Sequence, residues 1–179
     1  LKKGYKLGLG IDENTAMVVS ADREVEIVGY RGALLLDMKN AKSQDGEFNV
    51  SNVSLSYLDN GDRFNLANGA ITPSRDKAGG IVDAARPYYH GPLFTADILG
   101  NSAVIDLMAR LIDSDQHEAI GVALGSPDDK DPDLGFEFRF SRVADSAGFV
   151  SPLTDAYSVY RLRLDIRPIS VRRPLYQYR

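Results

Sequence analysis

The sequence contains no cysteine. This absence excludes disulfides, thiolate metal ligands and a cysteine nucleophile in one step. Histidine is scarce as well, with two residues in 179, which disfavours a zinc site. No apolar run approaches the ~20 residues that a membrane-spanning helix needs. We therefore predict no metal, no cofactor and no membrane partner.

Positive charge is also in short supply. Lysine and arginine number 21 against 25 acidic residues, so the net charge is -4 and the pI is near 5.2. Nucleic acid is held by clustered positive charge, so we expect no nucleic-acid partner. The 179 residues, 44% hydrophobic and 26% charged, are typical of one compact globular domain. The compartment stays open, with a secreted or periplasmic location favoured over a cytoplasmic one.

The chain begins at Leu1-Lys2-Lys3, without an initiator methionine or a signal-peptide pattern. We expect this start to be a boundary made by cleavage or by experiment. No internal repeat or low-complexity tract is visible.

Hydrophobic patterning predicts a strand-rich chain. Apolar runs separated by turn residues predict strands at 6–11, 16–20, 24–28, 32–37, 50–58, 63–66, 119–124, 136–141 and 160–167. Residues 39–49 and 70–92 are rich in turn-forming residues and predict a loop and a long surface excursion.

One segment has a clear helical period. Apolar residues from Val104 to Ile112 recur at three-and-four spacing, which predicts a helix over 102–112 with Asn101 or Ser102 as its cap. The runs Met17–Val19 and Leu34–Leu36 are continuously apolar, which suits strands covered on both faces. Together these patterns predict a layered, β-rich α/β or α+β domain.

The most informative stretch runs from Leu7 to Ala16. An apolar strand delivers Asp12 and Glu13 at its C-terminal end, where α/β enzymes place their chemistry. A carboxylate there could orient a histidine, bind a cation, or only form a turn with Asn14. Spacing alone favours the turn.

The residue sequence of this stretch favours a functional carboxylate over a simple turn. Gly8-Leu9-Gly10-Ile11-Asp12-Glu13-Asn14-Thr15-Ala16, followed by Glu26–Gly29 and Gly32-Ala33, resembles the segment around the triad acid of cyanophycinases, serine peptidases related to dipeptidase E. Residues 53–58 and 61–66 are similar to the last strands of that catalytic domain. The resemblance covers about Gly4 to Leu66. It implies the C-terminal part of a flavodoxin-like, class I glutamine amidotransferase-like domain over 1–69, with a β-rich extension over 70–179 packed on the same domain.

The resemblance also implies roles for single residues. Glu13 matches the acid that fixes the tautomer of the catalytic histidine and stabilises its imidazolium form. Asp12, Asn14 and Thr15 would support that loop, whereas the substrate-binding residues remain unknown. The complete enzyme would cleave cyanophycin, an arginine-branched polyaspartate, to β-aspartyl-arginine dipeptides. Its serine and histidine would lie on an N-terminal portion of the same protein, and a homo-oligomer is possible.

The sequence departs from the family where the other triad members are concerned. It has no Gly-x-Ser-x-Gly elbow. His117 follows Asp115-Gln116, but it comes after Glu13, whereas the family's histidine comes before the acid. Ser126 is followed by Pro127 and lacks the small neighbours and helix that an elbow needs. We interpret His117 as a surface or capping residue and Ser126 as a turn, and we predict that this chain alone is inactive.

Three other features are interpreted as structural or solvent-exposed and not as functional sites. The acidic run 128–133 fails the spacing of a helix-loop-helix calcium site, so a solvated loop is favoured over a bound cation. His90 is interpreted as a loop residue. The arginines between Arg161 and Arg179 alternate with apolar residues as far as Arg167, which indicates the solvent face of a strand and no partner.

Two alternatives to cyanophycin hydrolysis stay open. One is an aspartyl dipeptidase of the dipeptidase E type, and the other is a noncatalytic β-rich binding or assembly module. An elbow serine encoded upstream of Leu1 would favour either enzyme, and its absence would favour the module.

Overall fold

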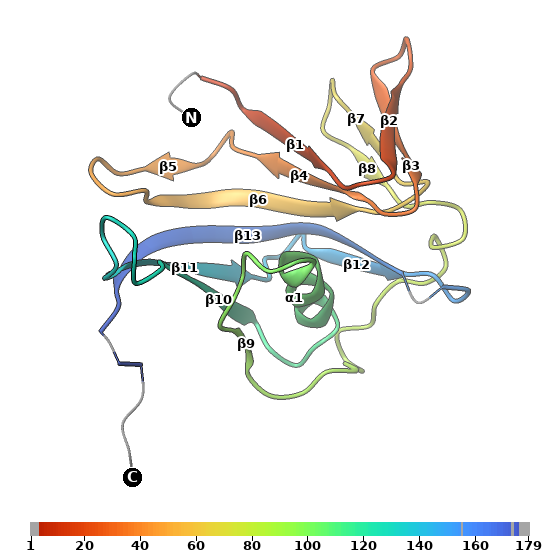
Figure 1. The fold of residues 1–179 in the computed structure, drawn as a ribbon. Coiled ribbons are helices and arrows are strands. Elements are labelled where there is room, and N and C mark those ends of the chain that lie inside the picture. Colours follow the sequence, from red (N-terminus) through yellow and green to blue (C-terminus); the bar gives the residue numbers. More distant parts are fainter. Residues whose placement is uncertain (1–3, 155, 173, 176–179) are drawn as a thin grey trace.

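The structure is a computed structural model that describes residues 4–154, 156–172 and 174–175. Leu1, Arg173 and Arg179 lie outside the described residues. Strands dominate the described part, which holds a single α-helix (Figure 1). Its elements are β1 (Leu7–Ile11), β2 (Thr15–Val19), β3 (Glu24–Gly29), β4 (Ala33–Asp37), β5 (Lys42–Ser43), β6 (Val50–Leu58), β7 (Arg63–Asn65), β8 (Ile71–Thr72), β9 (Leu93–Thr95), α1 (Ala103–Ile112), β10 (Glu118–Leu124), β11 (Leu134–Ser141), β12 (Ala147–Val150) and β13 (Tyr157–Ser170).

The strands form two sheets. The larger has the order β1-β4-β6-β13-β11-β10-β9, with β5 paired to β6 and β12 paired to β13. All its pairs are antiparallel except β9 with β10. The smaller, antiparallel sheet has the order β2-β3-β7-β8 and rises from one end of the larger sheet in Figure 1. The prediction of a strand-rich, layered fold is confirmed.

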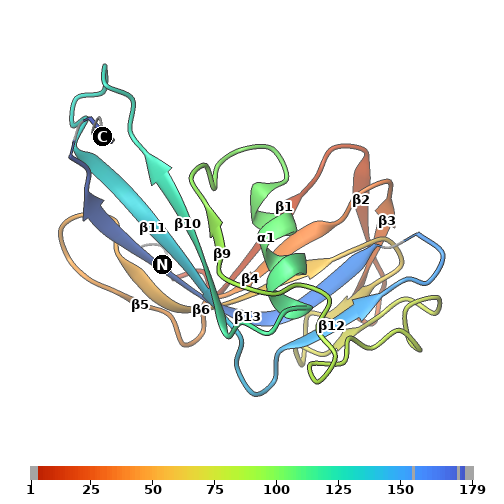
Figure 2. The same ribbon diagram turned by 90° about the horizontal axis from the view of Figure 1, so that it is seen from below.

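Two hydrophobic clusters lie on opposite faces of the larger sheet. In the first, buried side chains of α1 such as Leu107 and Leu111 pack against Phe140 of β11 and Leu162 of β13. Figure 2 shows α1 lying across that face. The second cluster joins the two sheets through side chains that include Val25, Ile27, Leu35, Leu58, Phe64 and Tyr160. The alternation of β13 therefore contributes to both clusters, because neighbouring strand residues point to opposite faces.

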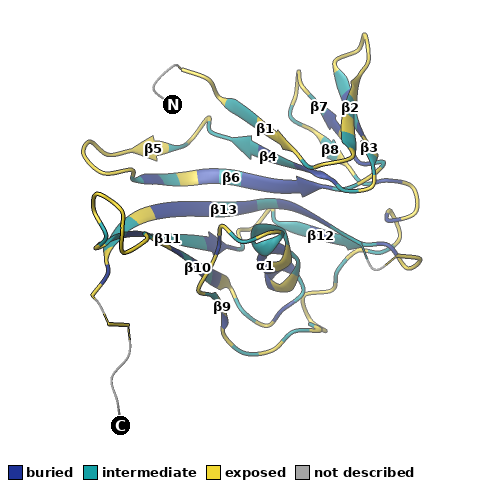
Figure 3. Ribbon diagram, viewed as in Figure 1, coloured by how far each residue is buried: buried dark blue, intermediate teal, exposed yellow. Residues whose placement is uncertain are grey.

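The two continuously apolar runs have different outcomes. In β4, Leu35 packs in the second cluster, while Leu34 and Leu36 pack against the first, so this strand is covered on both faces as predicted. The same prediction is wrong for β2, where Val18 is 56% exposed and Val19 is 58% exposed. The strand is the outer edge of the smaller sheet, and Figure 3 shows how much of it is open to solvent.

The predicted helix is confirmed to within one residue. Leu107, Met108, Leu111 and Ile112 form its buried stripe. Ser102 is the N-cap residue, but its backbone is left-handed, with φ of 61°, and its hydroxyl makes no capping hydrogen bond. That hydroxyl instead accepts a hydrogen bond from Arg31 Nη1 at 3.4 Å.

In the described residues, no helix combines the length and apolarity needed to cross a membrane.

The chain on either side of residue 69 shares one sheet. β13 lies between β6 and β11, so a strand of the later segment pairs directly with a strand of the earlier one. Figure 1 shows β6 and β13 running side by side through the centre of the molecule. The short strands β5, β8, β9 and β12 were not predicted, since two to four residues are too few to show a period.

Candidate functional site

The turn after β1 is clamped against the segment that joins β3 to β4. The backbone N–H of Asp12 donates to the carbonyl oxygen of Gly32 at 3.2 Å. Asn14 adopts a left-handed backbone with φ of 57°, and its carbonyl oxygen accepts from the N–H of Tyr30 at 3.0 Å. Asparagine tolerates this conformation better than most residues. The chain direction after Asp12 and Glu13 is thus set by hydrogen bonds to a second segment.

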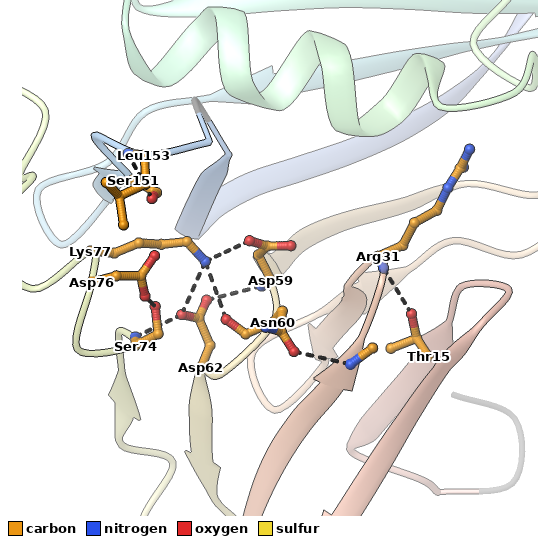
Figure 4. Close-up of polar contacts among 11 residues, drawn as sticks. Thr15, Arg31, Asp59, Asn60, Asp62, Ser74, Asp76, Lys77, Ser151 and Leu153 are labelled. Atoms are coloured by element: carbon orange, nitrogen blue, oxygen red, sulfur yellow. Dashed lines mark hydrogen bonds and ion pairs between the residues drawn. The ribbon is translucent and has the colours of Figure 1, made fainter.

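Thr15 and Gly29 complete this clamp. The hydroxyl of Thr15 accepts a hydrogen bond from the N–H of Arg31 at 3.2 Å (Figure 4) and donates to the carbonyl oxygen of Glu13 at 3.4 Å. Gly29 has φ of 155°, and a Cβ at this position would lie 2.4 Å from the carbonyl oxygen of Asn14. Only glycine permits this approach.

Glu13 itself is exposed, and its carboxylate makes no hydrogen bond or ion pair in the described part of the chain. It lines none of the larger cavities there. The described residues therefore hold Glu13 in place without supplying a histidine for it.

Asp12 is more buried than Glu13. Its Oδ2 atom is buried and lacks a hydrogen-bond partner among the described residues. Its charge acts on Tyr57, whose pKa is raised to about 12 by burial first, then by Asp59 and by Asp12. The two adjacent carboxylates thus occupy different environments, one turned toward the protein and one toward solvent.

A buried lysine supports the same region. Lys77 is 1% exposed, and its Nζ lies 2.6 Å from Asp59 Oδ2 and 3.6 Å from Asp62 Oδ1 (Figure 4). The carboxylate of Asp62 also accepts from the N–H groups of Asp59 and Ser74, both at 2.9 Å. Burial raises the pKa of Asp62. The Ser158 hydroxyl, Lys77 and these two amides lower that pKa, but burial has the larger effect.

This ionic cluster connects to the turn after β1 through Asn60. Lys77 Nζ donates to the carbonyl oxygen of Asn60 at 3.5 Å, and Asn60 Oδ1 accepts from the N–H of Gly29 at 3.0 Å. Sequence reasoning missed Lys77 because it lies in the segment 70–92, predicted as a surface excursion. That prediction is wrong at this residue, since its partners Asp59 and Asp62 come from a distant turn and leave no periodic signal.

His117 and Ser126 do not meet. They flank β10 at opposite ends, and a seven-residue strand spans about 23 Å. Both residues are exposed. The hydroxyl of Ser126 accepts from the N–H of Asp128 at 3.3 Å, as in a turn.

His90 lies 3.1 Å from Asp115, and the pKa of that carboxyl is lowered first by Gln116 and then by His90.

The acidic run 128–133 is a largely exposed loop. Asp129 is engaged within this loop, because its Oδ2 accepts from the N–H of Ser126 at 2.6 Å. Across residues 4–154, 156–172 and 174–175, no three histidine or acidic side chains gather in a metal-binding arrangement.

Comparisons with models of protein families, with curated proteins and with solved structures found no match for this chain. The resemblance to cyanophycinases therefore depends on the residues between Gly4 and Leu66 alone.

Proposed function

We propose that this chain supplies Glu13 as the acidic member of a composite Ser-His-Glu site in a serine-type peptidase that hydrolyses cyanophycin. The serine and the histidine belong to an N-terminal portion of the same protein. The observation that carries the proposal is the position of Glu13. Its backbone is clamped by hydrogen bonds on both sides, while its carboxylate is exposed and without a partner in the described part of the chain.

The edge of the larger sheet supports a site shared between this chain and an N-terminal portion. β1 pairs with β4 on one side and with no other strand among the described residues. Its sequence, Leu7-Gly8-Leu9-Gly10-Ile11, lacks the charges and prolines by which natural edge strands avoid pairing. A strand of the N-terminal portion that paired here would extend the sheet and end beside Glu13. Such pairing would join the two portions into one catalytic domain, although the sheet described here is largely antiparallel and so differs from the parallel sheet of a flavodoxin-like domain.

In such a site, Glu13 acts through the histidine. Its carboxylate accepts the N–H of one ring nitrogen, which leaves the other nitrogen free to take the serine proton as the hydroxyl attacks the scissile carbonyl. Glu13 stays ionised and stabilises the imidazolium that forms. The histidine then protonates the leaving amine, and water repeats the sequence on the acyl-enzyme.

The test uses the full-length protein. Replacing Glu13 by glutamine should lower kcat on cyanophycin about 10⁴-fold while the fold is kept, as expected for a triad acid. Glu47→Gln, at another exposed glutamate, is the control and should leave kcat unchanged. Full activity of Glu13→Gln would refute the role of this carboxylate. Activity on Asp-X dipeptides but not on the polymer would identify the aspartyl dipeptidase instead.

A second candidate is a noncatalytic binding or assembly module. It is favoured by the large apolar side chains that β1, β2 and β3 and the following turn leave exposed, namely Leu9, Ile11, Val18, Val19, Val28 and Tyr30. Exposed apolar side chains mark a protein contact where they gather into one patch. The module predicts that the upstream gene sequence lacks a Gly-x-Ser-x-Gly elbow, whereas the peptidase requires one.

A further inference from the structure

A polar cleft lies at the opposite end of β1 from Glu13. Leu7, the first residue of β1, pairs with Asp37, and Asp37 lines a cleft of about 280 Å³ between β4, β6, β13 and the loop before β12. Its polar lining includes Asp37, Asn40, Asn52, Asp145, Arg161 and Arg163. This volume is close to the lower end for small-molecule sites.

Two irregularities in the β6–β13 pair shape this cleft. The register of the pair shifts between Val159 and Leu162 and again between Leu164 and Ile166. Arg161 and Asn52 both have left-handed backbones, with φ of 57° and 60°. Such a conformation costs about 1 kcal/mol or more in an arginine and less in an asparagine, and residues that adopt it gather at functional sites. Bulges of this kind redirect side chains, here those of the two lining residues.

Side-chain acceptors hold both left-handed residues in place. The N–H of Arg161 donates to Ser56 Oγ at 2.9 Å, and the N–H of Asn52 donates to Asp165 Oδ1 at 2.7 Å. Ser56 and Asp165 are buried. These hydrogen bonds to buried side chains therefore fix the backbone positions of Arg161 and Asn52 beside the cleft.

The two arginines use little of their hydrogen-bonding capacity. Arg161 donates to the carbonyl oxygen of Gly69 at 3.4 Å, and its Nε lies 3.9 Å from Asp145. Arg163 donates to Ser141 Oγ at 3.4 Å. Its Nε is buried, lies 3.4 Å from Asp165, and has no hydrogen-bond partner among the described residues. Each guanidinium has five donors and favours bidentate carboxylates, so both retain capacity for an anionic group.

Negative charge lines the same cleft. Asp145 is mostly exposed, and Asp37 has a single ion pair, 3.7 Å from the exposed Lys39. A simple anion would be attracted by the arginines and repelled by these two carboxylates. A molecule with both signs of charge satisfies all four groups.

We propose that this cleft binds a small zwitterion of amino-acid or dipeptide size. Its carboxylate lies on Arg161 and Arg163, and its cationic group lies toward Asp37 and Asp145. The proposal does not depend on Glu13 or on any hydrolytic activity.

Calorimetry on the full-length protein tests this with four probes: L-lysine, acetate, n-butylamine and inorganic phosphate. We expect L-lysine to bind at least tenfold more tightly than each of the others. Acetate or phosphate binding as tightly as L-lysine would overturn the zwitterion in favour of a plain anion site. If L-lysine at a concentration on the order of 10 mM does not bind, the proposed site is refuted.

Variants locate the binding. Arg163→Gln should weaken L-lysine binding at least tenfold, and Asp145→Asn, in an exposed loop that tolerates substitution, should weaken it at least threefold. Arg167→Gln, at an exposed position of the same strand, is the matched control and should bind as the wild type does. Equal losses in Arg163→Gln and Arg167→Gln would contradict the assignment to this cleft. Circular dichroism confirms that each variant is folded.

Discussion

At the scale of single residues, the loop of Glu13 depends on side chains that lie outside that loop. Lys77 is the clearest of them. Its ammonium group forms ion pairs with two carboxylates next to the turn at Asn60, and Asn60 in turn holds Gly29 against the loop of Glu13. A buried ion pair of this kind is costly to break, because the remaining charge has no water to solvate it.

Lys77→Met should therefore lower the free energy of unfolding by about 3–5 kcal/mol at neutral pH. Burial already raises the pKa of Asp62, so the folded protein holds that proton more tightly than the unfolded chain does. The contribution of this carboxyl to stability then falls as pH rises through its folded pKa. Losing Lys77 raises that pKa further, so the deficit should shrink as pH is lowered. Urea unfolding at several pH values measures it.

Lys39→Met is the control for this prediction. Lys39 also pairs with an aspartate, but it is exposed, and surface ion pairs contribute at most about 1 kcal/mol. A deficit of Lys77→Met that stays constant across pH would contradict the assigned role of Asp62.

At the scale of elements, β13 is the strand that organises the fold. It pairs with β6, β11 and β12, and its side chains enter both hydrophobic clusters. Its alternation was visible in the sequence, but its irregular pairing with β6 was not. The bulge at Arg161 depends on the hydroxyl of Ser56, a residue of the neighbouring strand.

Ser56→Ala removes the acceptor for the N–H of Arg161. We expect a loss of about 1–3 kcal/mol in the free energy of unfolding, the cost of an unsatisfied buried donor. The same substitution should weaken L-lysine binding in the cleft, because Arg161 would lose its fixed position. Ser51→Ala, at a less buried position of β6, should change stability by less than about 0.5 kcal/mol. Equal effects of the two substitutions in urea unfolding would count against this account of the bulge.

At the scale of the whole molecule, Glu13 is exposed and its carboxylate has no histidine partner among the described residues. His117 and Ser126 lie at opposite ends of β10, and neither contacts Glu13. We expect the 179-residue chain alone to hydrolyse neither cyanophycin nor Asp-X dipeptides, measured as release of free amine. Any release that Ser126→Ala or His117→Ala abolishes would show that these residues come together in solution.

Much of the architecture was predictable from periodicity. The helix over 102–112 and the strands of residues 24–28, 50–58 and 119–124 appear within one or two residues of their predicted bounds, because each is long enough for burial to impose a period. The exposure of β2 was not predictable, since Met17-Val18-Val19 has the same composition whether or not a layer covers it. The Glu13 motif was visible as a local string, whereas the partners of Lys77 were not.

The sequence by itself determined the strand-rich class, the helix Ala103–Ile112 and the carboxylate at position 13, because these depend on residues close together in the chain. Tertiary structure alone decided which edge of the sheet stays open, where Lys77 finds its two carboxylates, and that Arg161 and Asp37 line one cleft. Those arrangements depend on pairing between segments far apart in sequence, and such pairing is selected by the burial and hydrogen bonding of the whole chain.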